Sequence, residues 1–243
     1  MLAVSPVALV VARMSSSRLP GKSLVTLGDD VVLGYVTNSL SQCDNISEVV
    51  VVTSTDPSDD PIAGWCKDRG LNASRGSLNN VAARVLGAAQ EFGAQAFVRV
   101  SGDSPLIDPV LVDYAVGLYR GSELDLVTNV FPRTFPRGQS VEVVRTESLA
   151  LACAGGLTVF EQEHVTQVYY LQSERFRIRN FTADQLESAS SMLKFSSSVH
   201  LAIDEAQDLV RSERVIQALG SVRPWEAGWE ACSQIALSLE NRA

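Results

Sequence analysis

The chain has 243 residues, of which 46% are hydrophobic and 20% are charged. This size predicts one large domain, and the apolar content excludes a disordered or low-complexity chain, which lacks the surface needed to form a core. The formal net charge of −8 argues against a protein that binds nucleic acid or an anionic membrane through a broad basic face. It does not argue against a small, local site for an anion.

Two further features bear on where the protein works. No uninterrupted apolar run exceeds six residues, whereas about 20 are needed to span a membrane, and the run at 7–12 lacks the basic region that precedes a secretory signal. The cysteines show no CxxC pair and no histidine at metal-ligand spacing, which favours reduced thiols; they are Cys43, Cys66, Cys153 and Cys232. We therefore expect a cytoplasmic protein without a membrane partner.

Short apolar runs alternate with amphipathic stretches in the first 110 residues, which is typical of an α/β domain. The runs are rich in β-branched residues and too short for buried helices, so they predict parallel strands at 7–12, 48–53 and 96–100. The stretches between them predict helices at about 32–42, 59–69 and 79–92. The pair Asp108-Pro109 predicts the start of a further helix.

The regular alternation of strands and helices ends in the second half of the chain. Strands are predicted at 124–129, 140–144, 176–181 and 199–203, and helices at 161–174, 205–219 and 225–239. The serine-rich stretch 188–198 predicts an exposed loop. With no internal repeat and no long linker, we expect one domain, 1–243, around a mixed, mainly parallel sheet.

Three segments that follow predicted strands carry the chemistry, because ligands of open α/β sheets bind beyond the carboxyl ends of the strands. The first, ARMSSSRLPGK at 12–22, contains Arg13, Arg18 and Lys22, and no acidic residue occurs from 1 to 28. Cations beside hydroxyls and free backbone N–H groups suit a polyphosphate. The alternative is a solvated basic loop, and the segment is not a Walker A motif.

The other two segments each place an aspartate after a strand. Asp103 in SGDSPLID has no helix directly after it to cap, so it is a candidate ligand for Mg²⁺, which takes one or two carboxylates together with substrate phosphates and water. Asp204 in IDEAQDL is as well explained by capping of the next helix. Together with the cationic loop, the two aspartates predict a metal–triphosphate site.

Six segments in order resemble the nucleotide-sugar cytidylyltransferases, most closely the branch of spore-coat polysaccharide biosynthesis, related to the acylneuraminate and 3-deoxy-octulosonate cytidylyltransferases. The resemblance covers roughly 7–212. The segments are ARMSSSRLPGKSL at 12–24, RGSLNNVAARV at 75–85, RVSGDSPLIDPVLVD at 99–113, NVFPRTFPRGQSVEV at 129–143, EQEHVT at 161–166 and IDEAQDL at 203–209.

The resemblance implies a Rossmann-like, GT-A-like nucleotidyltransferase domain, a homodimer, and transfer of CMP from CTP to a sugar, sugar acid or related acceptor with Mg²⁺ as cofactor. It implies a nucleotide-binding half at about 1–110 and an acceptor-binding, possible dimerisation region at about 125–200. The nucleotide-binding residues it implies are Ala12, Arg13, Ser17, Arg18, Lys22, Arg75, Gly76, Ser77, Asn80 and Asp103. The metal ligands are Asp103 and Asp204, and the acceptor-binding residues are Arg133, Arg137, Gln139, Glu142, Glu163 and His164.

The sequence departs from the family pattern at the acceptor block, where FPRGQSVEV replaces YPDGLDVEV. Arg137 stands in place of an acid, and Gln139-Ser140 in place of Leu-Asp, so the pocket is less negative. We expect an acceptor with an added anionic group or an altered hydroxyl pattern. The last block keeps only two aspartates and a leucine of VDTPEDL, which leaves an inactive nucleotide-binding homologue as an alternative. SLNNV loses the acids of SEDDV, which changes the groups available for recognition of the base and ribose.

We expect in-line attack of an acceptor oxygen on the α-phosphorus of CTP, catalysed by Lys22, Arg13 and Asp103 through charge stabilisation and positioning. His164 is a candidate base, with a structural or substrate-binding role as the alternative. A nucleotidyltransferase that uses another nucleoside triphosphate, or a phosphonate or polyol-phosphate acceptor, fits the same residues. The residues do not identify the acceptor.

Overall fold

The computed structural model describes residues 5–186 and 199–240. Within them, seven strands form one sheet in the order β5-β4-β1-β6-β8-β7-β9, and all but β8 run in the same direction. This confirms the predicted mixed, mainly parallel sheet. The strands are β1 Val7–Val11, β4 Val49–Ser54, β5 Asn72–Gly76, β6 Ala96–Ser101, β7 Leu126–Thr128, β8 Glu142–Arg145 and β9 Ile178–Asn180. A separate hairpin pairs β2 Thr26–Leu27 with β3 Asp30–Val31.

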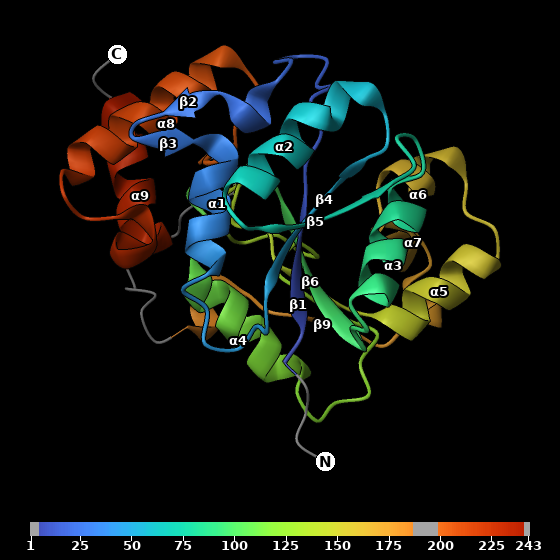
Figure 1. Cartoon of the computed structure of the whole chain (residues 1–243). Coiled ribbons are helices and arrows are strands. Elements are labelled where there is room, and N and C mark those ends of the chain that lie inside the picture. Colours follow the sequence, from blue (N-terminus) through green and yellow to red (C-terminus); the bar gives the residue numbers. More distant parts are fainter. Residues whose placement is uncertain (1–4, 187–198, 241–243) are drawn as a thin grey trace.

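Helices cover both faces of the sheet (Figure 1). Successive side chains of a strand point to opposite faces, so Ala8 and Val10 of β1 pack into one core and Val7 and Leu9 into the other. The first core is closed by α1 Val32–Leu40, α2 Asp60–Asp68, α4 Pro109–Tyr119 and α9 Pro224–Glu240. The second is closed by α3 Val81–Glu91, α5 Thr146–Ala154 and α7 Gln167–Leu171.

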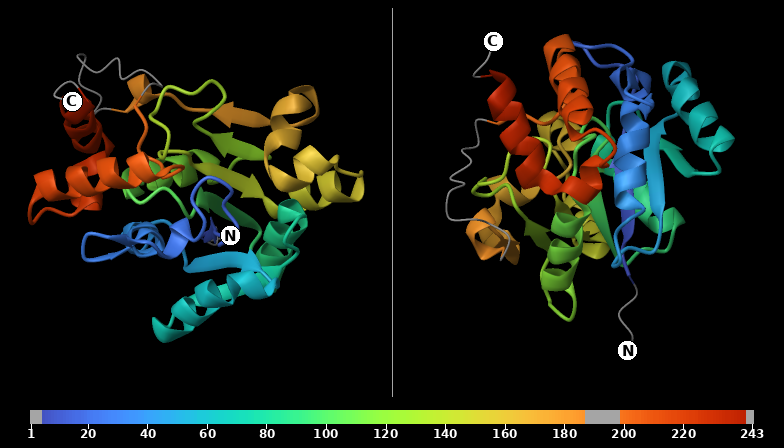
Figure 2. Two further views of the ribbon diagram at one scale, coloured as in Figure 1. Left: turned by 90° about the horizontal axis from the view of Figure 1, so that it is seen from above. Right: turned by 90° about the vertical axis from the view of Figure 1, so that its left-hand side faces the viewer.

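The last two helices, α8 Ala206–Leu219 and α9, pack against each other at one end of the molecule (Figure 2). A third apolar cluster lies between them and includes Val215 and Cys232. Val199 and Leu201 belong to the same cluster, so they anchor the segment that leads into α8. No helix of the described residues is long and apolar enough to cross a membrane.

The predicted strand at 199–203 is wrong. The segment forms one isolated β-bridge, in which Arg137 donates its N–H to the carbonyl of Val199 at 3.1 Å and accepts from Leu201 at 2.7 Å. A further backbone bond, from Ile203 to the carbonyl of Asp103 at 2.8 Å, belongs to no ladder. Gly138 follows with φ +96° and lies against the backbone of 201–202. The partner chain therefore turns away after one residue, and no strand ladder can extend.

One further prediction differs from the structure, and two elements were missed. The predicted helix at 161–174 is two short helices, α6 Val159–Glu163 and α7, because a capping box at Thr158 starts α6 early and the chain leaves helical geometry at His164. Strand β5, with the polar sequence NASRG, and helix α5 were not predicted. Asp108 does cap α4, as predicted, and the loop predicted at 188–198 lies outside the described residues.

Candidate active site

The loop after β1 lies across the carboxyl ends of the parallel strands. The N–H of Met14 donates to the buried carboxylate of Asp59 at 2.7 Å, and Gly21 donates to the carbonyl of Met14 at 2.8 Å. Gly21 has φ +76°, a left-handed conformation that favours glycine. This turn brings Lys22, the first residue of a short 3-10 helix, back beside the start of the loop.

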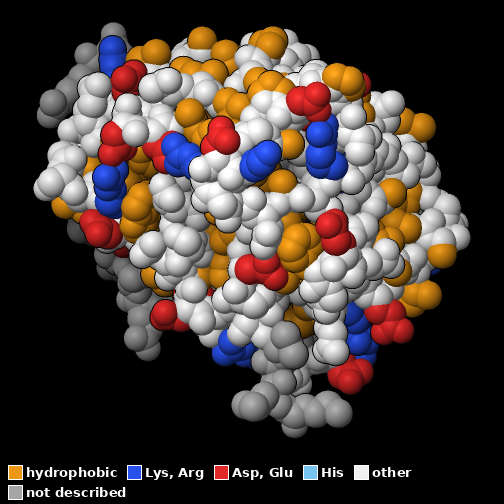
Figure 3. Space-filling view, viewed as in Figure 1, with side chains coloured by type: hydrophobic (Ala, Val, Ile, Leu, Met, Phe, Trp, Pro, Cys, Tyr) orange, Lys and Arg blue, Asp and Glu red, His pale blue; other side chains and the backbone are white. Residues whose placement is uncertain are grey.

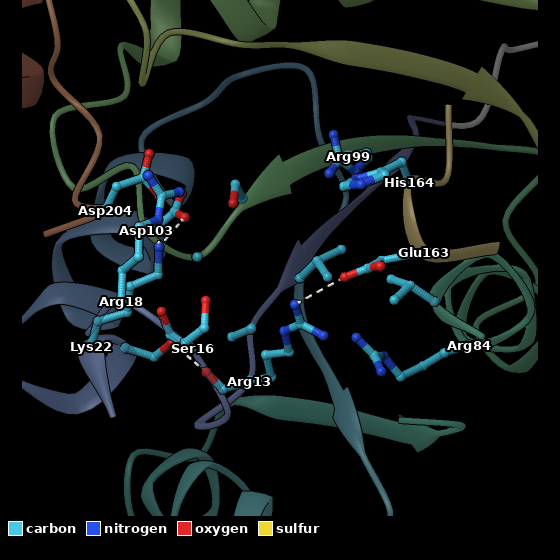
Figure 4. Close-up of a pocket in the computed structure, with 17 residues that line it drawn as sticks. Arg13, Ser16, Arg18, Lys22, Arg84, Arg99, Asp103, Glu163, His164 and Asp204 are labelled. Atoms are coloured by element: carbon cyan, nitrogen blue, oxygen red, sulfur yellow. Dashed lines mark hydrogen bonds and ion pairs between the residues drawn. The ribbon is translucent and has the colours of Figure 1, made fainter. Parts of the chain in front are cut away.

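Lys22 joins three separate parts of the chain (Figure 4). Its ammonium group donates to Asp103 Oδ2 at 2.7 Å, to the carbonyl of Ile203 at 2.7 Å and to Asp204 Oδ1 at 3.3 Å. Arg18 forms a second ion pair with Asp204, at 3.1 Å. The structure therefore brings together the predicted cations and both predicted metal ligands. Asp204 does not cap α8, since Glu205 occupies that position.

Arg13 extends along the opposite wall, toward the end of α6 (Figure 4). Its guanidinium lies 3.3 Å from Glu163 Oε1, and both side chains are nearly half exposed. The His164 ring is exposed and lies 4.7 Å from the ring of Phe160. Glu163 and His164 thus line the same pocket as the cationic loop, whereas the resemblance placed them with the acceptor.

These side chains enclose a pocket of about 320 Å³, called here the phosphate-side pocket. It is lined by Val11, Ala12, Arg13, Ser16, Ser17, Arg18, Lys22, Ser23, Val81, Arg84, Arg99, Ser101, Gly102, Asp103, Glu163, His164 and Asp204. Arg84 was not predicted. It is 3% exposed, donates to the carbonyl of Ser77 at 2.6 Å, and has two guanidinium nitrogens without a hydrogen-bond partner among the described residues.

The block expected to contact the nucleoside instead supports Arg84. Arg75 binds the carbonyl of Ser54 at 2.7 Å and Asp60 at 2.6 Å, and Asn80 caps α3 through the N–H of Ala83. Gly76 and Ser77 also lie outside the pocket lining. A Cβ at Gly76 would come within 3.0 to 3.2 Å of Arg84. The sequence did contain a signal for Arg84, because this residue belongs to the family-like segment at 75–85 and lies one turn into helix α3.

A second pocket, of about 410 Å³, adjoins the first and is called here the acceptor-side pocket. It is lined by Arg99, Ser101, Asp103, Ser104, Arg133, Arg137, Gly138, Ser140, Ala202 and Asp204. Four of these, Arg99, Ser101, Asp103 and Asp204, line both pockets. The two aspartates therefore stand on the wall between a site for a polyphosphate and a site that contains Arg133 and Arg137.

Two residues predicted to bind the acceptor are placed elsewhere. Gln139 is fully buried, and its side chain accepts from the N–H of Asp108 at 3.0 Å. Glu142 is 2% exposed and binds Arg99 at 2.6 Å and the hydroxyl of Tyr170. Burial, followed by repulsion from the Glu142 carboxylate, raises the pKa of the Tyr170 phenol. Glu142 thus holds Arg99, another lining residue that was not predicted, in place.

The donor set fits a magnesium ion. Asp103 and Asp204 already converge on one cation, the Lys22 ammonium, and two carboxylates completed by phosphate oxygens and water match the octahedral preference of Mg²⁺. The described residues contain no cluster of three or more His, Cys, Asp or Glu side chains arranged for a metal. The remaining ligands would therefore come from the substrate and solvent.

A cationic loop and paired aspartates at the carboxyl edge of a mainly parallel sheet define an α/β enzyme that handles nucleotide phosphates. Residues 7–219 match the family model described as Cytidylyltransferase. The chain belongs to the cytidylyltransferase family and is a CTP-dependent nucleotidyltransferase, as the sequence resemblance predicted.

Individual relatives agree with the family. The chain is 28% identical over 227 residues to the spore coat polysaccharide biosynthesis protein SpsF of Bacillus subtilis, covering 85% of this chain and 91% of that protein. The structure of a cytidylyltransferase from Leptospira borgpetersenii aligns with a TM-score of 0.87 at 28% identity, over 98% of this chain and 96% of that one. A CMP:2-keto-3-deoxy-manno-octonic acid synthetase complexed with CTP shares the fold, with a TM-score of 0.66 at 18% identity, over 88% and 99%.

Proposed function

We propose that this protein transfers CMP from CTP to an oxygen of a small acceptor, with Mg²⁺ and with release of pyrophosphate. The observation that carries the proposal is the wall formed by Asp103 and Asp204 between the two pockets. An acceptor oxygen on one side of this wall lies next to a phosphate on the other. Holding both reactants in this way converts a bimolecular step into an effectively unimolecular one.

The phosphate-side pocket supplies the charge that a triphosphate needs. Arg13, Arg18 and Lys22 come from one loop, and Arg84 adds a buried guanidinium from α3. Asp103 and Asp204 would hold Mg²⁺, which when bound neutralises phosphate charge and polarises phosphate oxygens. Lys22 and Arg13 then stabilise the negative charge that develops on the departing pyrophosphate.

The step is an in-line displacement at the α-phosphorus. A bond forms between the acceptor oxygen and the α-phosphorus. The bond from the α-phosphorus to the oxygen that bridges it to the β-phosphorus breaks, and pyrophosphate leaves with that electron pair. A hydroxyl acceptor loses its proton to solvent. His164 lines the phosphate-side pocket and not the acceptor-side pocket, so we propose that it contacts the nucleotide and does not act as the base.

We also propose that the protein is a homodimer. Exposed apolar side chains gather on α5–α7, with Leu151 68%, Val159 81%, Phe160 51% and Leu171 61% exposed, and apolar side chains follow the right-hand edge of the molecule in Figure 3, where these helices lie. The charged side chains on that face are scattered, without a broad basic patch. Light scattering of the purified protein is expected to give twice the mass of one chain, and the mass of a single chain would contradict the proposal.

Release of pyrophosphate tests the proposed reaction. We expect stabilisation by CTP with Mg²⁺ in a thermal-shift comparison with UTP, ATP and GTP, and pyrophosphate release when CTP is combined with an acceptor from a panel of sugar acids, amino sugars, sugar phosphates and phosphonates. Stronger stabilisation by another nucleotide would contradict the use of CTP. Binding of CTP without pyrophosphate release from any acceptor would favour the inactive homologue.

A further inference from the structure

The acceptor-side pocket contains two guanidinium groups that no carboxylate neutralises among the described residues. Arg133 donates to Ser140 Oγ at 3.0 Å, and its buried Nη1 has no hydrogen-bond partner in the part of the chain that the structure describes. Arg137 is exposed, and its side chain makes no hydrogen bond or ion pair with any described residue. Both side chains line the same pocket.

The other charges that line this pocket are already paired. Arg99 binds the buried carboxylate of Glu142 at 2.6 Å. Asp103 is held by Lys22 at 2.7 Å, and Asp204 by Arg18 at 3.1 Å. The pocket therefore carries two positive charges in excess, those of Arg133 and Arg137.

The pKa of Arg133 also indicates that the acceptor-side pocket has positive charge in excess. Burial, followed by repulsion from Arg137, lowers the pKa of the Arg133 guanidinium. A half-buried cation next to a second cation is unfavourable unless an anion joins them. The guanidinium fork binds two oxygens of one group at once, which suits a carboxylate or a phosphate.

We propose that the acceptor carries a phosphoryl or phosphonyl dianion, and that Arg133 and Arg137 bind it on the side of the pocket away from the reacting oxygen. A phosphate monoester has a charge of about −1.5 to −2 at pH 7, which matches two cations, whereas a carboxylate would neutralise only one. Ser140, whose oxygen accepts from Arg133, retains a hydroxyl proton for a further phosphate oxygen. This inference rests on the proposed function and specifies its acceptor.

A binding measurement tests the inference apart from turnover. The full-length protein is first saturated with a CTP analogue that has a methylene group between the α- and β-phosphorus atoms, and methyl phosphate or acetate is then titrated by calorimetry. We expect methyl phosphate to bind at least tenfold more tightly than acetate. Arg133→Gln and Arg137→Gln each weaken methyl phosphate binding at least tenfold and leave the affinity for the analogue within twofold. Arg214→Gln, at an exposed position on α8, changes neither.

The outcomes separate the two proposals. If the analogue does not bind, the proposed function fails. If the analogue binds but methyl phosphate binds no better than acetate, or binds the Arg133→Gln, Arg137→Gln double variant as well as the wild type, the inference is wrong and the proposed function stands. For an acceptor that supports pyrophosphate release, the double variant raises KM more than it lowers kcat. An acceptor without a phosphoryl or phosphonyl group whose KM is unchanged in the double variant would also overturn the inference.

Discussion

The two adjoining pockets use positive charge in different ways. On the phosphate side, each cation of the loop has a carboxylate partner: Arg13 pairs with Glu163, Arg18 with Asp204, and Lys22 with Asp103 and Asp204. On the acceptor side, Arg133 and Arg137 have no such partner among the described residues. The paired cations are held in place before substrate arrives, and the unpaired cations select for an anion.

The difference follows from what each ligand brings. A triphosphate that arrives with Mg²⁺ carries its own cation, which can take the carboxylates while the loop cations turn to the phosphates. For Arg13 and Arg18, whose side chains are 40% and 59% exposed, the exchange is easy because exposed ion pairs are worth only about 0 to 1 kcal/mol. An acceptor brings no cation, so the pocket that receives it must supply the positive charge unpaired.

The largest effect is expected at the wall shared by both pockets. Asp103→Asn keeps the shape of the side chain but removes a negative charge, so we expect Mg²⁺-dependent pyrophosphate release from CTP to fall roughly 10³-fold or more, by comparison with the loss of one strong electrostatic group in other active sites. Asp68→Asn, at an exposed position on α2, is the matched control. Near-normal turnover of Asp103→Asn with an unchanged melting temperature would remove Asp103 from the metal site.

Lys22→Met is expected to lower kcat roughly 10²-fold, because the ammonium stabilises charge that develops on pyrophosphate. The same variant leaves Asp103 and Asp204 without the cation they now share. We therefore also expect Mn²⁺, measured by electron paramagnetic resonance, to bind the nucleotide-free variant more tightly than the wild type. An unchanged kcat together with unchanged Mn²⁺ affinity would limit Lys22 to a structural role in holding Asp103 and Asp204.

Two arginines of the segment at 75–85 test the sequence prediction against the structure: Arg75 was predicted to bind the nucleotide, whereas Arg84 lines the pocket. Arg84→Gln is expected to raise the Kd for CTP by at least about tenfold, since a hydrogen bond to a charged group contributes about 1.5 to 3 kcal/mol. Arg75→Gln is expected to change it less than twofold, because Arg75 is bound to Ser54 and Asp60 outside the pocket. Melting temperatures measured for both variants account for any loss of fold, and the reverse order of effects would restore the original assignment of Arg75.

The sequence predicted the parts of the site that depend on strand ends. The loop at 12–22 and Asp103 follow buried strands whose apolar runs are plain, so their meeting at one edge of the sheet follows from topology. Asp204 also lies at the predicted site, but it does not follow a strand. The backbone bond from the N–H of Ile203 to the carbonyl of Asp103, at 2.8 Å, holds it there. Asp204 was thus placed at the site through a predicted strand at 199–203 that the structure does not contain.

Side-chain direction could not be predicted in the same way. Gln139 and Ser140 are neighbours in one block, yet Gln139 is buried against Asp108 while Ser140 lines the pocket, as expected where an extended chain alternates its faces. Glu142 is separated from the pocket by its bond to Arg99. Such placements depend on tertiary partners that are distant along the chain, at separations of 31 and 43 residues for these two bonds.

The smallest effect concerns the support of the shared wall, and it depends on pH. Asp208 accepts hydrogen bonds from the N–H groups of Asp204 and Glu205 at 3.0 and 2.9 Å, and from Arg211 at 2.7 Å. Burial raises the pKa of Asp208, but these hydrogen bonds outweigh it, and the net pKa lies below the ordinary value of 3.8. The Asp208 carboxylate therefore holds Asp204 in place and stabilises the folded state while it is ionised.

Because the folded-state pKa is lowered, this stabilisation is fully present above the unfolded pKa of about 4 and is lost as the pH falls through the lower folded value. We expect Asp208→Asn to reduce the free energy of unfolding by about 1 to 2 kcal/mol at pH 6, measured by urea denaturation. The difference from the wild type should shrink as the pH is lowered from about 5 to about 3. A difference that stays constant over this range would mean that the shape of the side chain, and not its charge, supports Asp204.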